Sequence, residues 1–387
     1  MAGQHINILV FPAFYPPHIG GMESFAYELN NRLGIEERYS VTVFAPNFSG
    51  IDNQDQKNTE GVDILHYPAF EIIQNYPCPK LWSPNFWRLL YLISKKPHDI
   101  VISHTRFFIA SFLASIFAKI KNIPLIHIEH GSSPVQSKSA LITHLSQMYD
   151  HTLGGIVIRN ADRIIAISDE VSRFIKKRWN RSSLVIHRGF DPKTIDAIPV
   201  SSNFPKKPGV TRLMYIGRLI SGKGVDVLLD SLKSIASENW ELYIIGDGPE
   251  MRTLQQAASV FDPEKIIFVG QKRWPEVIAL LKTTNIFINP SRTEGLPTTI
   301  AEAALCSKAI IATDAGGTHA LLPPENYDLL VPVDNPSSLS DKISLLLREE
   351  GRITTAGVAA RQFVETNFTW EKFIQKFLKI LIEIHQK

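Results

Sequence analysis

The sequence predicts an α/β protein of two doubly wound domains, each with a parallel sheet covered by helices. In both halves of the 387-residue chain, short apolar runs alternate with longer helical patterns, which is typical of such sheets. The alternation is interrupted once, between Pro192 and Pro208, by a stretch with four prolines and little periodicity. The length suits two or three domains of ordinary size.

Before the interruption, the pattern predicts the strands Ile6–Phe11, Val41–Phe44, Ile100–Ser103, Leu125–Ile128, Arg163–Ile167 and Leu184–Ile186. The helical patterns between them include Glu23–Leu33, Phe107–Ile120 and Asp169–Lys177. We interpret the stretch from Pro192 to Pro208 as the linker between the domains.

After the linker, the pattern predicts the strands Arg212–Ile216, Glu241–Ile245, Lys265–Val269, Asn285–Asn289, Ala309–Thr313 and Leu329–Val331. The expected helices are Val225–Ser234, Pro249–Ala258, Pro275–Leu281 and Pro297–Leu305. A last helix, Trp370 to His385, has its apolar residues on one stripe and could pack on either domain. Because ligands of such sheets bind beyond the carboxyl ends of the strands, we expect the active site between the two domains.

The composition excludes several classes of protein. Hydrophobic residues make up 44% of the chain and charged residues 20%, as in an ordinary globular protein, and the net charge of +3 does not indicate binding to nucleic acid. Two cysteines, Cys78 and Cys306, are too few for a disulfide framework and too isolated for a metal site, which fits a reducing, cytoplasmic compartment. We see no signal peptide, and the longest uncharged stretch, Phe107–Ala118, is shorter than the roughly 20 residues that span a bilayer.

Two carboxylates, Glu294 and Glu302, enclose the most informative segment. Glu294 follows a predicted strand, and Pro297 suits the first position of the helix that comes next. The amides of Thr298 and Thr299 would then be unpaired donors at the positive end of that helix, where a phosphate can bind. Glu302, one turn further along, could bind hydroxyl groups. The segment therefore offers what a sugar nucleotide requires.

The loop from Gly217 to Gly224 follows the first strand of the second domain and carries two cations, Arg218 and Lys223. A leaving diphosphate gains negative charge in the transition state, and fixed cations stabilise it. The Arg218 guanidinium can bind phosphate oxygens in bidentate fashion, whereas Lys223 acts as a point charge.

These motifs together resemble those of the retaining glycosyltransferases of family 4, whose signature is two glutamates separated by seven residues. The loop matches the family pattern Gly-Arg-x4-Lys-Gly residue for residue. The resemblance covers nearly the whole chain and implies the GT-B fold, in which two Rossmann-like domains face each other across a deep cleft. We expect the first domain at residues 1–195, the second at 209–370, and a helix at 371–387 that crosses back to the first.

The resemblance also implies the roles of the catalytic residues. Glu302 would bind the ribose, and Glu294 would orient the donor sugar. Arg218 and Lys223 would stabilise the leaving diphosphate. His130, which follows a strand of the first domain, would bind the C6 hydroxyl of the donor sugar.

Further substrate-binding residues follow from the same resemblance: Gly20, Gly21, Gly217, Gly248, Val269, Gly295, Leu296, Pro297 and Thr298. The Gly20–Gly21 pair would let the backbone approach the diphosphate and the sugar, although glycines in turns are also common. Val269 would approach the base through its backbone. Two neighbours of His130, Glu129 and His127, could instead point inward, because successive residues of a strand alternate between its faces.

One departure from the family pattern lies before the linker, where Arg188 stands in place of an Asn. Two absences also count. The chain has no Asp-x-Asp motif, so we expect no metal cofactor on the diphosphate. It has neither a dinucleotide-binding glycine pattern nor a Walker lysine loop, which argues against NAD-dependent and ATP-hydrolysing enzymes.

The resemblance implies a metal-independent transferase that moves a sugar from a nucleotide-diphosphate sugar to a hydroxyl of a glycan or a lipid-linked acceptor. Surface polysaccharide synthesis, such as that of O-antigen, capsule or lipopolysaccharide, is the expected setting. Two alternatives stay open: an isomerase like the nucleotide-sugar 2-epimerases, and a non-catalytic subunit that supports a partner enzyme.

Residues 80–96 contain four cations, no acidic residue, two Trp, one Tyr and one Phe. Basic segments rich in aromatic residues can lie in a membrane interface, which predicts peripheral contact with an anionic membrane, at the inner face of the cytoplasmic membrane. The alternative is a helix whose aromatic side chains pack on the core.

Overall fold

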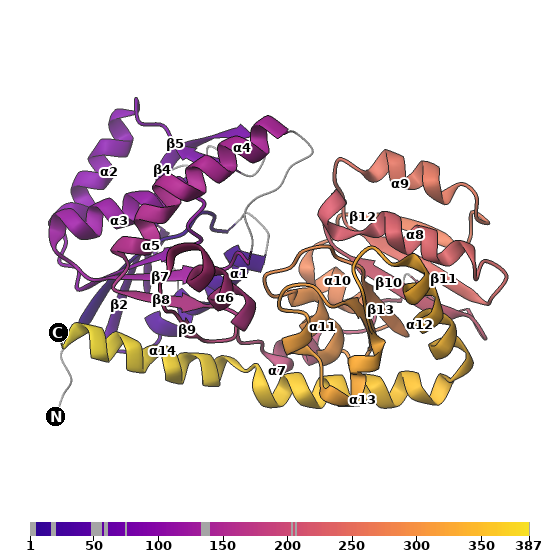
Figure 1. The fold of residues 1–387 in the computed structure, drawn as a ribbon. Helices are drawn as coiled ribbons and strands as arrows, with labels where there is room; N and C mark the ends of the chain where they lie inside the picture. Colours follow the sequence, from indigo (N-terminus) through magenta and orange to yellow (C-terminus); the bar gives the residue numbers. More distant parts are fainter. Residues whose placement is uncertain are drawn as a thin grey trace. The chain divides into compact units, whose positions relative to one another are not determined.

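The computed structural model describes residues 5–16, 21–47, 56–57, 61–73, 76–132, 140–202, 204–205 and 207–386. The chain divides into two compact units, which are Met1–Arg188 together with Phe373–Lys387, and Gly189–Lys372. Figure 1 shows each unit as a sheet flanked by helices, so both have the predicted α/β architecture.

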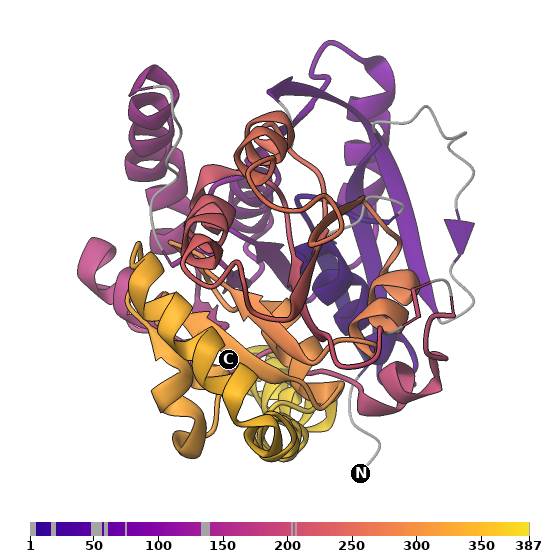
Figure 2. The ribbon, with the colours of Figure 1, turned by 90° about the vertical axis from the view of Figure 1, so that its right-hand side faces the viewer.

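Within the described residues, the first unit has a nine-stranded sheet in the order β3-β4-β2-β1-β6-β7-β8-β9, with β5 beside β4. Its strands are β1 (Ile6–Phe11), β2 (Tyr39–Asn47), β3 (Gln56–Lys57), β4 (Val62–Ile73), β5 (Tyr76–Pro79), β6 (Ile100–His104), β7 (Leu125–Glu129), β8 (Arg163–Ala166) and β9 (Leu184–Val185). The pairs from β4 through β2 to β9 are parallel, whereas β3 and β5 run antiparallel to β4. The long strand β4 runs beside β2 (Figure 2).

Helices cover this sheet, namely α1 (Gly21–Gly34), α2 (Pro84–Lys95), α3 (Ile109–Lys121), α4 (Ala140–Tyr149), the π-helical segment η1 (Asp150–Gly154), α5 (Gly155–Asn160), α6 (Asp169–Trp179) and α14 (Trp370–His385). The start and end of α6 follow from its sequence. Ser168 caps its first turn by accepting a hydrogen bond from the Val171 amide, and Asn180 ends it in the left-handed conformation.

The second unit has a sheet in the order β12-β11-β10-β13-β14-β15, parallel throughout the described residues. Its strands are β10 (Thr211–Ile216), β11 (Trp240–Ile245), β12 (Ile266–Gly270), β13 (Ile286–Asn289), β14 (Ala309–Thr313) and β15 (Leu330–Val331). Its helices are α7 (Pro192–Ala197), η2 (Ser221–Lys223), α8 (Val225–Lys233), α9 (Met251–Ala258), α10 (Trp274–Leu281), α11 (Thr298–Leu305), η3 (His319–Leu321), η4 (Pro324–Leu329), α12 (Pro336–Arg348) and α13 (Glu350–Asn367).

The expected end of the first domain, residue 195, differs from the division in the structure, which falls after Arg188. Gly189 packs so closely on the start of α14 that a Cβ atom there would lie 2.4 Å from the Trp370 Cα. The Phe190 amide donates to the Phe368 carbonyl oxygen at 2.8 Å. These backbone contacts assign the residues after Arg188 to the second unit.

The linker prediction was also wrong at its start, because α7 occupies Pro192–Ala197. Asp191 caps this helix by accepting a hydrogen bond from the Lys193 amide at 3.0 Å, and Pro192 takes the first helical position. An Asp followed by Pro is a recognised start signal for a helix, and four prolines in the stretch concealed it.

Helix α14 begins in the second unit and belongs to the first from Phe373 onward. The Phe373 and Phe25 rings meet edge to face, with their centroids 5.2 Å apart. Phe377 and Leu381 are fully buried. The apolar stripe of this helix therefore forms part of the core of the first unit.

Candidate active site

The signature segment lies between β13 and α11, where the sequence predicted a turn from strand to helix. Its first helical residue is Thr298, not Pro297 as predicted, because Pro297 has an extended ψ of 99° and caps the helix instead. The Thr298 and Thr299 amides still lie in the first turn, where α-helices leave their N–H groups without intrahelical partners. The helix is therefore one residue shorter than predicted at its start, and the anion site expected there stays a prediction.

The structure brings together two predicted catalytic residues, Lys223 and Glu294, from separate loops. The Lys223 ammonium nitrogen lies 2.6 Å from Glu294 Oε1. Ser291, which the sequence analysis did not single out, donates its hydroxyl to the same oxygen at 2.7 Å. Glu294 is only 10% exposed and Lys223 is 29% exposed, so the pair is partly shielded from water while a ligand can still reach the lysine.

Close backbone contacts fix the loop that carries Lys223. Gly224 ends it with a φ of +65°, and a Cβ atom there would lie 2.0 Å from the Pro290 carbonyl oxygen. Gly248 packs on the same loop, because its Cβ would lie 2.4 Å from the Leu219 carbonyl oxygen. The close approach that glycine allows therefore explains Gly248 without any ligand.

Arg292 links the same loop to two neighbouring elements. No pattern in the sequence had indicated this residue. Its guanidinium makes a bidentate ion pair with Asp226 at 2.9 and 2.8 Å and a second pair with Asp334 at 2.6 Å. It also donates to the Ser221 carbonyl oxygen, and its amide donates to that of Gly222 at 2.9 Å. The hydrogen bonds and charge of Asp226, and then those of Asp334, raise the Arg292 pKa, so the guanidinium stays charged.

Arg218 and Gly217 start the loop. The Arg218 side chain is exposed, and its carbonyl oxygen accepts a hydrogen bond from the Tyr215 hydroxyl at 3.1 Å. Gly217 lies over the same tyrosine, because a Cβ there would be 2.5 Å from the hydroxyl oxygen. Burial, reinforced by the negative charge of Glu294, raises the Tyr215 pKa, so the hydroxyl stays protonated.

Gly295 and Leu296 follow Glu294 in the turn, and Leu296 is buried. The loop containing Gly316 packs directly against this turn. Gly316 has a φ of +57°, and its Cβ would fall 1.7 Å from the Glu294 carbonyl oxygen. The sequence pattern gave no signal for this contact, since it joins segments that are distant in the chain.

Glu302 lies on α11 and accepts a hydrogen bond from the Trp274 indole nitrogen at 3.0 Å. Trp274 begins α10, the helix that follows β12 and its residue Val269. Just after Val269, the carbonyl oxygen of Gly270 accepts from the Gly246 amide at 3.0 Å. The predicted ribose residue Glu302 is thus linked to the helix that follows the predicted base residue Val269 in the chain.

In the first unit, His130 follows β7 on a loop that Glu129 holds in place. Glu129 Oε1 accepts from the amides of His130, at 3.0 Å, and Gly131, at 2.7 Å. The His130 ring lies 3.4 Å from His104, nitrogen to nitrogen, and edge to face with Phe25. Burial lowers the pKa of His130 to about 3, so its ring is neutral near pH 7 and can exchange hydrogen bonds with a sugar hydroxyl.

Both strand neighbours of His130 point inward, which is the alternative that the sequence left open. Glu129 and His127 are fully buried. The His127 ring lies 3.1 Å from Glu129 Oε2 and 2.8 Å from the Ser103 hydroxyl, on opposite nitrogens. These buried side chains therefore hold the loop of His130 in place from the core of the first unit.

A buried arginine completes that support. Arg106 pairs with Glu129 at 3.0 Å and with Asp150, in the π-helical segment, at 2.7 Å. Its guanidinium also packs on the Phe174 and Trp179 rings, at 4.6 and 5.1 Å from their centroids. Burial alone would raise the pKa of Glu129, but the Arg106 charge outweighs it and the net pKa is lower than usual.

Gly20 lies outside the described residues, and Gly21 is the first residue of α1. The Arg188 guanidinium donates a hydrogen bond to the Gly21 carbonyl oxygen and lies 5.8 Å from the centre of the Phe25 ring. The residue that departs from the family pattern therefore contacts the predicted Gly-Gly loop directly.

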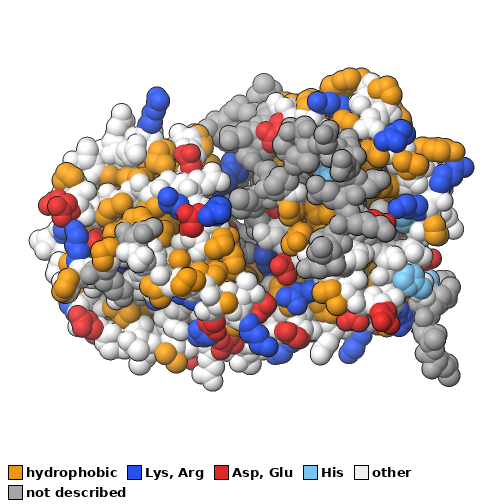
Figure 3. All heavy atoms as spheres, turned by 180° about the vertical axis from the view of Figure 1, so that it is seen from behind, with side chains coloured by type: hydrophobic (Ala, Val, Ile, Leu, Met, Phe, Trp, Pro, Cys, Tyr) orange, Lys and Arg blue, Asp and Glu red, His pale blue; other side chains and the backbone are white. Residues whose placement is uncertain are grey.

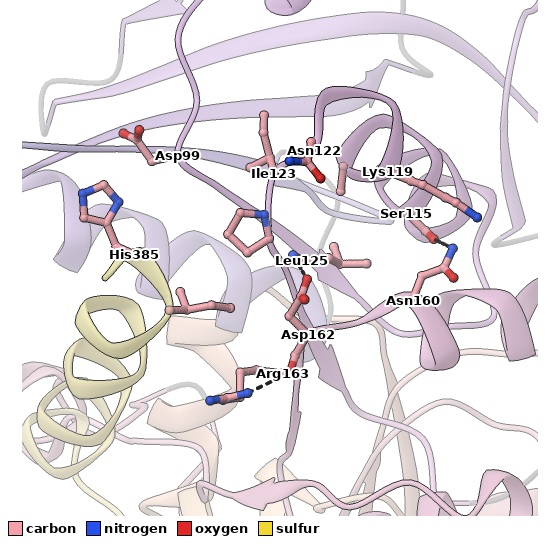
Figure 4. A pocket seen from close by; sticks show the side chains of 13 residues that line it. Asp99, Ser115, Lys119, Asn122, Ile123, Leu125, Asn160, Asp162, Arg163 and His385 are labelled. Atoms are coloured by element: carbon pink, nitrogen blue, oxygen red, sulfur yellow. Dashed lines mark hydrogen bonds between the residues drawn. The ribbon is translucent and has the colours of Figure 1, made fainter. Parts of the chain in front are cut away.

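A separate pocket of about 550 Å³ lies in the first unit, at the amino ends of β7 and β8 and beside the end of α14. Figure 4 shows Asp162 in its wall, where the carboxylate accepts from the Leu125 amide at 2.8 Å, and His385 opposite. Because the predicted site residues follow the carboxyl ends of their strands, this pocket is not the predicted site.

In the part of the chain that the structure describes, no group of three or more His, Cys, Asp or Glu side chains is placed to hold a metal ion. None of the helices in that part of the chain is both long and apolar enough to cross a membrane.

Two family models match the chain. Residues 19–194 match the model described as Glycosyltransferase Family 4, and residues 210–349 match the model described as Glycosyl transferases group 1. An uncharacterized glycosyltransferase of Methanocaldococcus jannaschii is 31% identical over 386 residues, which cover 97% of this chain and 98% of that protein.

More distant relatives are named for their activities. The GDP-mannose-dependent alpha-(1-6)-phosphatidylinositol monomannoside mannosyltransferase of Mycobacterium tuberculosis is 24% identical over 97% of this chain and 98% of that protein. The GPI3 subunit of the Saccharomyces cerevisiae phosphatidylinositol N-acetylglucosaminyltransferase is 25% identical over 82% of this chain and 70% of that protein.

Solved structures share the fold. Sucrose-phosphate synthase from Thermosynechococcus elongatus superposes with a TM-score of 0.80 at 18% identity, over 98% of this chain and 99% of that chain. Anabaena HepE in complex with UDP and glucose superposes with a TM-score of 0.74 at 17% identity, over 98% of this chain and all of that chain. Both likenesses cover both units.

Proposed function

This chain belongs to the family 4 glycosyltransferases and has their GT-B fold, and on that basis we propose that it is a retaining, metal-independent transferase that uses a nucleotide-diphosphate sugar. The observation that carries the proposal is the 2.6 Å contact between Lys223, in the loop after β10, and Glu294, in the turn before α11. A cation and a carboxylate are thus in contact just ahead of the first-turn amides of α11, in the chain segments that would hold a sugar diphosphate.

Each group has a separate task in the reaction. The acceptor oxygen attacks the anomeric carbon on the face from which the diphosphate leaves, the bond from that carbon to the phosphate oxygen breaks, and a phosphate oxygen takes the acceptor proton. Lys223 and Arg218 stabilise the charge that grows on the leaving diphosphate. Glu294 orients the donor sugar, Glu302 binds the ribose, and the neutral His130 ring exchanges a hydrogen bond with a sugar hydroxyl.

The activities named for related proteins support a nucleotide-sugar donor and a glycan or lipid-linked acceptor. HepE was captured with UDP-glucose, and the mycobacterial relative depends on GDP-mannose, which favours a nucleotide-sugar donor here. Relatives act on phosphatidylinositol or its mannoside, and a lipopolysaccharide galactosyltransferase superposes with a TM-score of 0.66 at 18% identity. We therefore propose a hydroxyl of a glycan or a lipid-linked acceptor, in the synthesis of surface polysaccharide.

Product analysis tests the reaction. The purified chain is incubated with UDP-, GDP- and ADP-sugars, each with an acceptor lipid extract, with an acceptor glycan and without acceptor, in EDTA. We expect one donor to yield a glycoside whose anomeric configuration, read by NMR, equals that of the donor. Inverted configuration would contradict the retaining mechanism. An altered sugar nucleotide without acceptor would favour the isomerase.

The structure supports a membrane contact at α2 and the turn before it. Phe86, Leu89 and Ile93 of this helix are buried, as the core alternative expects. Three other aromatic rings of the segment point to solvent, since Trp82 is 69%, Trp87 54% and Tyr91 60% exposed. Figure 3 shows hydrophobic side chains beside Lys and Arg on the end of the first unit that carries α2 in Figure 1.

The positive charges of residues 80–96 favour an anionic membrane as the partner. Lys80, Arg88, Lys95 and Lys96 lie in the same segment, which has no acidic residue. Exposed aromatic rings insert at the level of lipid headgroups, and cations beside them attract anionic lipids. We propose that the face of α2 binds the anionic inner surface of the cytoplasmic membrane and so brings the enzyme to a lipid-linked acceptor.

Sedimentation with vesicles tests this contact. We expect the protein to sediment with phosphatidylglycerol vesicles at low salt, to be released at high salt, and to ignore phosphatidylcholine vesicles. A Trp82→Ala, Trp87→Ala double variant should lose the binding, whereas Val260→Ala, an exposed apolar residue of the second unit, should keep it. Equal sedimentation of all three proteins would contradict the proposal.

A further inference from the structure

Trp274 was not among the predicted site residues, yet it contacts one of them directly. Its indole N–H donates to Glu302 Oε1 at 3.0 Å, and its ring is only partly buried. A buried indole usually finds a hydrogen-bond partner within the core. Because the Trp274 ring is only partly buried, part of its surface stays accessible next to Glu302, a predicted site residue.

The backbone of Trp274 is fixed by the local structure. Trp274 is the first residue of α10, and Pro275 occupies the first turn. A capping box holds this helix start, because the Arg273 amide and guanidinium both donate to Glu276 Oε2, at 3.2 and 3.0 Å. The ring is therefore presented from a rigid helix start and needs no ligand to be placed there.

Three groups of the second unit match the three parts of a nucleotide, in the order phosphate, ribose and base. The first-turn amides of α11, at Thr298, suit phosphate, and Glu302, one turn further along the same helix, suits the ribose. Trp274 contacts Glu302 from the side of α10, which follows the carboxyl end of β12. The position beyond the ribose is that of the base.

We propose that Trp274 is a part of the nucleotide subsite, and the inference rests on the proposed function. Its indole N–H holds the Glu302 carboxylate in one orientation, and its ring stacks on the nucleobase. A carboxylate accepts several hydrogen bonds at once, so Glu302 can bind the indole and a ribose hydroxyl together. Stacking does not depend on the identity of the base, because every base has a π face.

Substitutions at this position separate the two tasks. Trp274→Phe keeps a ring that can stack but removes the N–H, whereas Trp274→Ala removes both. We expect Trp274→Ala to weaken nucleoside diphosphate binding about ten- to a hundredfold, with Trp274→Phe in between. Inorganic diphosphate, which lacks both ribose and base, should bind all three proteins equally.

The experiment is a calorimetric titration of UDP, GDP and ADP, and of inorganic diphosphate, into the wild type, both Trp274 variants, Glu302→Ala and the control Val260→Ala. Thermal unfolding of each variant in the absence of ligand checks that it is folded. If Glu302→Ala loses nucleotide affinity but Trp274→Ala keeps it, the inference about Trp274 is wrong and the proposed function stands. If the wild type binds no nucleotide, the proposed function fails and the inference fails with it.

A fluorescence measurement gives an independent readout. A base that stacks on Trp274 should quench its emission, so the nucleotide-dependent quench of the wild type should be lost in Trp274→Phe even though that variant still binds. A quench of full size in Trp274→Phe would place the stacking ring elsewhere and overturn the inference.

Discussion

At the scale of single residues, Lys223 is the group whose charge the proposed reaction uses most directly. Glu294 compensates that charge at 2.6 Å, and Arg292 fixes the surrounding loop through Asp226 and Asp334. The lysine is therefore held in position by protein groups, which is what stabilisation of a transition state by a fixed charge requires.

We expect Lys223→Ala and Arg218→Ala each to lower kcat about ten- to a hundredfold, since a hydrogen bond to a charged group is worth about 1.5–3 kcal/mol. The donor Kd should change less, because the charge on the diphosphate grows in the transition state. Steady-state kinetics and donor titration measure the two effects. Lys233→Ala, which removes an exposed lysine paired with Asp230, is the control, and near wild-type kcat in both site variants would contradict the assigned role.

The lowered pKa of His130 predicts how the free energy of unfolding depends on pH. Its pKa is about 3 in the folded protein, compared with an ordinary value of 6.5, so between these values the folded protein binds fewer protons than the unfolded chain. The stability linked to neutral His130 is present above about pH 6.5 and is lost as the pH falls toward 3, by at most about 1.4 kcal/mol per pH unit. His130→Asn should make the fall in the free energy of unfolding shallower between pH 6.5 and 5.

Denaturant unfolding at a series of pH values measures this slope. His144→Asn, which replaces an exposed histidine on α4, should leave the slope of the wild type unchanged. A slope for His130→Asn as steep as that of the wild type would show that the histidine is not held neutral by the fold.

At the scale of elements, the strands of the second unit were the easiest to predict. β10, β11, β13 and β14 are buried apolar runs bounded by polar residues, and each lies within one residue of its expected position. Their hydrophobic pattern is set by burial on both faces of a parallel sheet. The carboxyl ends of these strands then predicted where the site loops would lie.

The strands β4 and β5 were not predicted because they lack that pattern. β4 contains Asp63, His66, Pro68 and Glu71 and pairs with β5 only near one end, in an antiparallel arrangement. β5 lies at an edge of the sheet and contains Pro77 and Pro79, which are tolerated at sheet edges but make the local sequence look like a loop. The start of α11 was misplaced by one residue. The sequence shows that a helix begins near Pro297, but not whether this proline is the cap or the first helical residue.

The contacts that hold the site together could not be predicted from the sequence. Arg292 bonds Asp226 and Asp334, and Gly316 packs on Glu294. Each pair joins segments from different βα units, and no local motif records which ones meet. The residue types that contact a ligand carry a pattern, whereas the residues that position them are known only once the fold is known.

A pair of glycines tests the packing of the site turn. Gly316→Ala should destabilise the protein by about 1–3 kcal/mol and lower its activity, because the residue has a φ of +57° and its Cβ would strike the Glu294 carbonyl oxygen. Gly351→Ala, in α13, meets nothing within 4 Å and should stabilise the helix by about 0.5–1 kcal/mol. Thermal and denaturant unfolding compare the two, and equal effects would show that the turn is not tightly packed.

At the scale of the whole molecule, α14 returns the end of the chain to the unit that contains its beginning. Phe373, Phe377 and Leu381 bury its apolar stripe in the first unit. The sequence predicted the helix and its stripe, but periodicity alone did not show which domain it packs on.

Phe377→Ala tests the contribution of this helix to the stability of the first unit. Deleting a fully buried ring costs about 3–5 kcal/mol, so we expect a clearly lower midpoint of thermal unfolding, with Lys379→Ala, exposed on the same helix, as the unaffected control. An unchanged midpoint for Phe377→Ala would mean that the helix is not part of the core.

The central claim is that the second unit binds a nucleotide-diphosphate sugar without a metal. The most direct test is a thermal-shift titration with UDP, GDP and ADP, with and without EDTA, on the wild type and on Glu302→Ala. We expect one nucleotide to stabilise the wild type by about 2.7 kcal/mol at 100 times its Kd, equally in EDTA, and to have little effect on Glu302→Ala at the same concentration. No stabilisation by any of the three nucleotides, or stabilisation that EDTA abolishes, would contradict it.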